Sequence, residues 1–207
     1  NRPVIAIRDV TQRRRNDEGA TQIFVYMKNA PRIFASIVAA LDALALNVVD
    51  AKIVSSKNEV VLDTFTVLDS TGAPVGNKPF LTERIKSKLL KYLSTLGQPN
   101  LCSGRRTSRA LRHFMLKTEV TITNNVDYSI LNVVAPDRPG LLAKIADIFV
   151  EMNITIINAR ITTLGERVED VFEVSKNGKS IAESCINQRL KEKICRELDL
   201  HVARAST

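Results

Sequence analysis

The chain contains one pattern of strands and helices written twice, and this internal repeat constrains its fold more than any other feature. The segment IFVYMKNAPRIFASIVAALDALALNVVDAKIVSS, from Ile23, can be laid over ILNVVAPDRPGLLAKIADIFVEMNITIINARITT, from Ile130. Pro31 and Pro139 are 108 positions apart, as are Ala51 and Ala159. A one-residue deletion then aligns DTFTV, from Asp63, with DVFEV, from Asp170. A 207-residue chain built in this way predicts two small, similar domains.

In each copy the spacing of the apolar residues indicates first a strand and then a helix. Tyr128 to Ala135 has the character of a strand, and a helix is predicted from Pro139, where a missing N–H is harmless. Residues three and four apart then form apolar stripes: Leu141, Leu142, Ile145, Ile148, Phe149 and Met152 in the second copy, and Ile33, Phe34, Ile37, Val38, Leu41 and Leu44 in the first.

A β-hairpin and a second helix follow each first helix. The hairpins are predicted over Asn47–Ser56 with Val60–Leu68 and over Ile154–Leu164 with Arg167–Ser175, because these β-branched runs flank short polar turns. The second helices are predicted over Phe80–Leu96 and Ile181–Leu198.

These elements predict an α+β protein of two tandem ferredoxin-like βαββαβ units, each an antiparallel sheet with helices on one face. We place the first unit at 21–96, with a last strand at 110–118, after a linker at 97–109. The second unit is placed at 119–200, between an N-terminal extension at 1–20 and a tail at 201–207. Its last strand is short, missing or replaced by Glu119 to Thr123.

Alternation in the second copy predicts which side chains face the helices. Ile157, Ala159 and Ile161 share one face, which we assign to the core. The other face carries Asn158, Arg160 and Thr162, and the opposite assignment would bury an arginine.

Composition excludes several classes of protein. The chain has no apolar run of membrane-spanning length, and its first 20 residues hold arginines and acids where a signal peptide would be apolar. Its three cysteines, Cys102, Cys185 and Cys195, are far apart, which favours a reducing cytoplasm and no metal site. The formal charge of +8 is concentrated in two segments expected to be solvated, Arg13–Arg15 and the arginines at 105, 106, 109 and 112.

No catalytic motif is present. The sequence has no G-x-G-x-x-G, P-loop, H-E-x-x-H or G-x-S-x-G pattern, and only two histidines, His113 and His201. We therefore predict no catalytic residue, metal or cofactor in this chain. The strand that would stack on RNA in a similar fold reads ERVEDVFEV, which is acidic and lacks paired aromatics, so we do not expect RNA to bind the sheet.

One turn has the chemistry of a small binding site. In APDRPGLLAKIADIF a strand leads through Asp137, Arg138, Pro139 and Gly140 directly into a helix. Unpaired N–H groups at a helix start suit a carboxylate, and Gly140 would allow close approach. Asp137 could cap the helix or receive an ammonium group. The simpler interpretation, a plain strand-to-helix connection, stays open.

The D-R-P-G-L turn followed by INARITTLGERVEDVFEV resembles an ACT domain, a βαββαβ module that binds amino acids. RHFMLKTEV, TQIFVYMKNAPRIFASIVAALD and VLDTFTVLD extend the similarity to the C-terminal tandem ACT region of the bifunctional uridylyltransferase/uridylyl-removing enzymes of nitrogen regulation. The resemblance implies a cytoplasmic glutamine sensor that controls uridylylation of the PII signalling protein. It also implies upstream nucleotidyltransferase and HD hydrolase domains, with Mg as the parent enzyme's cofactor and residues 1–20 as the tail of the hydrolase domain.

The resemblance also implies the residues of a ligand site. In the second unit these are Asp137, Arg138, Pro139, Gly140 and Leu141, faced by Asn158 and Arg160. The turn of the first unit lacks both the acid and the glycine, so its candidates are weaker. They are Asn29, Pro31 and Arg32 of the turn, and Asp50 at the position equivalent to Asn158. Two alternatives remain: a structural module that forms a homodimer without ligand, and a nucleic-acid-binding segment in the arginine-rich linker.

Overall fold

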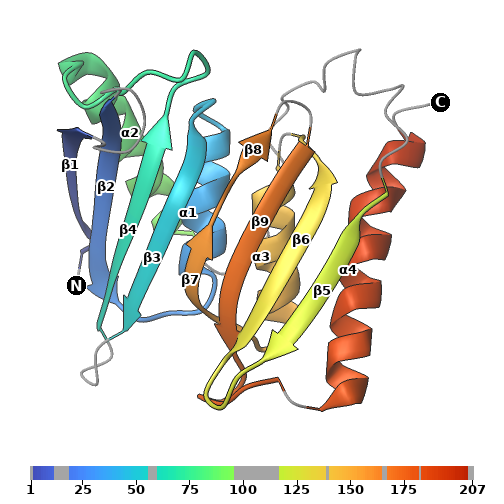
Figure 1. Ribbon diagram of the computed structural model, residues 1–207. Coiled ribbons are helices and arrows are strands. Elements are labelled where there is room, and N and C mark those ends of the chain that lie inside the picture. The colour runs from blue at the N-terminus through green and yellow to red at the C-terminus, as the bar shows by residue number, and fades with distance from the viewer. Residues whose placement is uncertain are drawn as a thin grey trace. The chain divides into compact units, whose positions relative to one another are not determined.

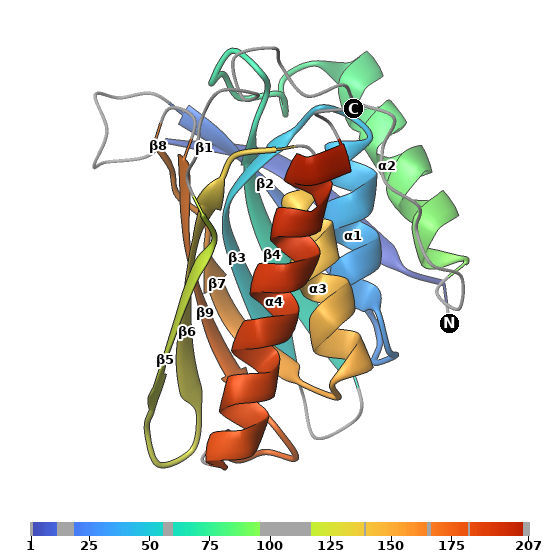
Figure 2. The same cartoon turned by 90° about the vertical axis from the view of Figure 1, so that its right-hand side faces the viewer.

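The computed structural model describes residues 2–11, 19–55, 60–95, 117–138, 140–164, 167–181 and 183–204. The chain divides into two compact units, Asn1–Ser103 and Gly104–Thr207 (Figure 1). Each unit contains an antiparallel sheet, and its two helices cover one face of that sheet (Figure 2). The predicted α+β class, with antiparallel sheets and helices on one face, is confirmed.

The sheet of the first unit has the order β1-β2-β4-β3. Its strands are β1 (Val4–Thr11), β2 (Gly19–Lys28), β3 (Asn47–Ser55) and β4 (Val60–Leu68). Helix α1 (Ile33–Asp42) follows β2, and helix α2 (Pro79–Leu93) follows β4. Pro79 stands in the first turn of α2, where its fixed φ suits a helix start.

The second unit repeats this arrangement with the order β7-β9-β6-β5, and the short β8 also pairs with β9. Its elements are β5 (Glu119–Asn124), β6 (Ser129–Pro136), α3 (Leu141–Glu151), β7 (Thr155–Arg160), β8 (Thr163–Leu164), β9 (Arg167–Ser175) and α4 (Ser184–Arg204).

The edge strand next to β2 differs from the sequence prediction. The sequence analysis places residues 1–20 outside the first unit, but Val4–Thr11 forms β1 and pairs with β2 along its whole length. Most of the last strand predicted at 110–118 lies outside the described residues, and Lys117 and Thr118 belong to no strand. An edge strand needs only one neighbour, so the repeat alone could not show which end of the unit supplies it.

The second unit resolves the question that the sequence left open. Glu119–Asn124 is the strand beside β6, and α4 extends to Arg204, into the segment predicted as a tail. Each unit therefore runs strand-strand-helix-strand-strand-helix, with its edge strand first.

An equivalent hydrogen bond in each unit ties the segment before the last helix to the sheet. In the first unit the Thr21 hydroxyl donates to Asp9 Oδ1 at 2.6 Å and accepts the Val75 N–H at 2.6 Å. The amides of Gly76 and Asn77 donate to the Asp9 carboxylate at 2.7 and 2.9 Å. In the second unit the Ile181 N–H donates to the Ser129 hydroxyl at 2.8 Å. Ser129 is the equivalent of Thr21, 108 positions on.

We expect Asp9→Ala to lower the free energy of unfolding by about 2–3 kcal/mol, because it removes the carboxylate that accepts hydrogen bonds from the Thr21 hydroxyl and the Asn77 amide. Urea unfolding would measure the loss. Asp127→Ala, in an exposed loop, is the control and should change stability by less than about 0.5 kcal/mol. An equal effect of the two substitutions would show that Asp9 does not hold β1 in place.

The helix-facing side of strand β9 is apolar except at one position. Val168, Phe172 and Val174 of β9 are buried, and Asp170 lies on the same side between Val168 and Phe172. Phe172 meets Phe149 of α3 edge to face, with ring centroids 5.3 Å apart. The equivalent strand of the first unit, β4, buries Val61, Asp63, Phe65 and Val67 in the same alternation.

Strand β7 corrects one predicted core residue. Ala159 and Ile161 are buried as expected, but Ile157 is 38% exposed, and Ile156 is buried in its place. A register shift between Ile156 and Asn158 inserts an extra residue, which changes the alternation on one side of the bulge.

Candidate functional site

The turn before α3 is the centre of the candidate site. Gly140 is the N-cap residue of α3 and has φ 79° and ψ 0°, a left-handed conformation that favours glycine. The Leu141 N–H donates to the Arg138 carbonyl at 3.3 Å, and the Lys144 N–H donates to the Gly140 carbonyl at 2.9 Å. Gly140 is half-buried, whereas Leu141 is 4% exposed and packs in the core. Pro139 lies outside the described residues.

This geometry provides amide donors for an anion. The first N–H groups of a helix have no acceptor within it, and within the described residues the N-cap of α3 makes no side-chain cap hydrogen bond. The helix dipole adds to the attraction for a negative group placed there. The turn is therefore suited to a small carboxylate.

Within the second unit, Asn158 and Arg160 do not lie beside this turn. Asn158 of β7 pairs with Glu173 of β9, and Glu173 pairs in turn with Ile130 near the start of β6. The turn follows Pro136, at the opposite end of β6. Six residues of strand separate the two levels, roughly 20 Å. Arg160 pairs with Val171 and is therefore nearer to the level of the turn. Its side chain is exposed, on the opposite face of β7 from the buried, helix-facing Ala159. The half-buried Asn158 uses its Oδ1 to accept the Ala159 N–H at 3.1 Å.

The first unit has the same turn conformation without glycine. Arg32 is the N-cap of α1 and has φ 70°, so this position has a side chain where the second unit has Gly140. Asn29 and Pro31 are exposed in this turn. Asp50 of β3 pairs with Thr66 of β4, and Thr66 pairs in turn with Gln22, which is six residues before the end of β2. Asp50 therefore lies away from the turn, as Asn158 does in the second unit.

Sequence reasoning missed a buried acid that interacts with the turn. Asp170 is 1% exposed, and its Oδ1 accepts the Thr162 N–H at 3.4 Å. Burial raises the pKa of Asp170 to about 7, and the negative charge of Asp137 adds to the rise. Burial likewise raises the pKa of Asp63, its equivalent in the first unit, to about 7. An acid within an apolar strand face, present in both copies, was the signal available in the sequence.

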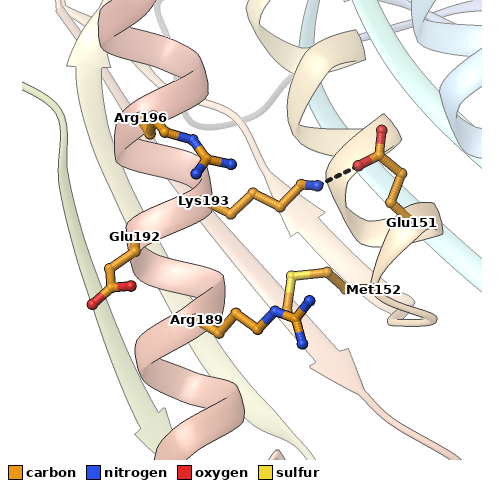
Figure 3. A pocket seen from close by; sticks show the side chains of 6 residues that line it. All are labelled: Glu151, Met152, Arg189, Glu192, Lys193 and Arg196. Carbon is orange, nitrogen blue, oxygen red and sulfur yellow. Dashed lines mark ion pairs between the residues drawn. The ribbon is translucent and has the colours of Figure 1, made fainter.

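A second depression lies at the other end of α3 and is separate from the turn. It has a volume of about 250 Å³ and is lined by Glu151, Met152, Arg189, Glu192, Lys193 and Arg196 (Figure 3). Lys193 Nζ pairs with Glu151 Oε2 at 2.5 Å across it. Its lining comes from the C-terminal end of α3 and from α4, so it does not include the helix-start amides.

In the described part of the chain, no three His, Cys, Asp or Glu side chains gather as metal ligands would. Cys185 and Cys195 are free thiols, and Cys102 lies outside the described residues. None of the described helices combines the length and the apolar character needed to cross a membrane.

The ACT domain family matches residues 129–188, from the first residue of β6 into α4. The second unit contains an ACT domain. The turn at Asp137 to Gly140 lies within the matched residues, between the first strand and the first helix of the ACT domain.

Curated relatives extend the similarity beyond the ACT domain. The chain is 41% identical over 199 residues to the bifunctional uridylyltransferase/uridylyl-removing enzyme of Stutzerimonas stutzeri, and 40% identical over 204 residues to that of Azotobacter vinelandii. These alignments cover 95% and 97% of this chain but 22% of each relative. The chain thus spans about a fifth of the length of these relatives. An aspartate kinase from Synechocystis aligns with a TM-score of 0.40 at 16% identity, over 81% of this chain and 27% of that one.

Proposed function

We propose that this chain is the amino-acid-sensing region of a bifunctional uridylyltransferase/uridylyl-removing enzyme, and that its ACT domain binds glutamine at the start of α3. The similarity of nearly the whole chain to about a fifth of such enzymes supports the assignment of the region. The left-handed Gly140 beside uncapped helix-start amides is the observation that supports the binding site.

In this proposal the ligand's α-carboxylate accepts hydrogen bonds from the first free amides of α3. A sensor that responds near millimolar ligand has only about 4 kcal/mol of binding free energy. A ligand can shift the equilibrium between two conformations of an enzyme only by the difference in its binding free energy for them. This difference is commonly about 1–3 kcal/mol. Glutamine binding would then favour removal of uridylyl groups from the PII protein over their transfer from UTP in the parent enzyme.

Calorimetric titration of the chain with glutamine tests the site. We expect Gly140→Val to weaken binding at least tenfold, because a branched side chain would occupy the space above the helix-start amides and strain a backbone at φ 79°. A thermal-shift screen of the twenty amino acids would identify the preferred ligand, since a ligand that binds the folded state raises its stability.

Gly178→Val is the matched control. Gly178 lies in the same unit at φ 73°, and nothing stands within 4 Å of an added Cβ, so the substitution imposes similar backbone strain away from the turn. It should bind glutamine as the unmodified chain does. Equal binding by both variants would reject the site, and a glutamine-independent dimer in sedimentation, with no amino acid bound, would favour the purely structural alternative.

A further inference from the structure

Asp170 is a buried acid with one oxygen that is not hydrogen-bonded. It is 1% exposed on the helix-facing side of β9, and its Oδ2 has no hydrogen-bond partner among the described residues. Its other oxygen accepts one long hydrogen bond from Thr162. Buried carboxylates are normally paired with a cation or several donors, because transfer of the charge from water is costly. The unpartnered Oδ2 therefore has capacity for a cationic or donor group.

The register of the sheet places this acid near the end of the sheet from which the turn leaves. Asp170 is opposite Val133, three residues before β6 ends at Pro136. Thr162, which contacts it, follows β7 at the same end of the sheet. Asp137 of the turn is close enough for its charge to act on Asp170, so two carboxylates approach one another there. A cation placed between them would be attracted by both.

We propose that Asp170 is the residue that binds the α-ammonium group of the ligand. This inference rests on the proposed function and assigns the second half of the same site: the amides at the start of α3 bind the carboxylate of an α-amino acid, and the Asp170 carboxylate forms an ion pair with its ammonium group. From the sequence alone, Asp137 is the candidate for this role.

Asp170 is 1% exposed, so the groups that cover its carboxylate must move aside when an ammonium group binds. Ligand binding is then coupled to a conformational change, and a regulatory ligand requires such a difference between two conformations. Thr162, between β7 and β8, would take part in this change because its N–H donates to the same carboxylate.

Titrations of the full 207-residue chain at pH 8 with glutamine and with its analogue lacking the α-amino group test this assignment. We expect the unmodified chain to bind glutamine at least tenfold more tightly than the deaminated analogue. Asp170→Asn should weaken glutamine binding at least tenfold and make the two affinities equal. Asp137→Asn should have a smaller effect, since Asp137 is half-buried at the surface of the turn.

Asp63→Asn is the matched control, because Asp63 is the buried equivalent in the first unit and its Oδ1 also lacks a hydrogen-bond partner among the described residues. It should leave glutamine affinity unchanged. Glutamine binding by folded Asp170→Asn within twofold of the unmodified chain would overturn the role of Asp170 alone, as would equal binding of glutamine and its analogue by the unmodified chain. Failure of the unmodified chain to bind any amino acid would overturn the proposed function as well.

Discussion

Asp63→Asn should raise the free energy of unfolding by about 2 kcal/mol at pH 8 and should give no stabilisation at pH 4. The pKa of Asp63 is raised by burial to about 7, against 3.8 for an ordinary aspartate. The folded state therefore holds this proton up to about pH 7, while the unfolded chain releases it near pH 4. Stability contributed by the protonated acid is complete below pH 4, is lost as the pH rises to about 7, and stays lost above that.

The size of this effect follows from the difference in pKa between the two states. About three pKa units correspond to roughly 4 kcal/mol. Asparagine removes this cost but leaves a buried amide without a full set of partners, which costs about 1–3 kcal/mol. Urea unfolding of both proteins from pH 4 to pH 8 would measure the difference. A difference that is the same at every pH would show that Asp63 is not a buried titrating acid.

Phe172→Ala should cost about 3–5 kcal/mol of stability, because it removes a fully buried ring from the centre of the second sheet. The substitution also removes the edge-to-face contact with Phe149. Circular dichroism during denaturant unfolding would report the loss. Phe80→Ala is the control, since Phe80 is 83% exposed and its removal should change stability by less than about 0.5 kcal/mol. Equal losses would contradict the assignment of the core.

The repeat predicted much of the fold because hydrophobic periodicity is a local property. The first helix of each unit and the central hairpins lie where their apolar spacing placed them, for example α3 at Leu141–Glu151 and β9 at Arg167–Ser175. The strand-to-helix turn was also visible, since Pro139 and Gly140 mark a boundary in any context. Its left-handed backbone at Gly140 agrees with the choice of glycine there.

The sequence by itself determined the two-unit α+β architecture and the turn before α3, because both depend on the order of residues along a short segment. The tertiary structure alone decided that Val4–Thr11 completes the first sheet, that a bulge exposes Ile157, and that Asn158 lies far from the turn. It also decided that Asp170 is buried opposite Val133, three residues before β6 ends at the turn. Strand pairing and register set these positions, and both depend on contacts between residues distant in the chain.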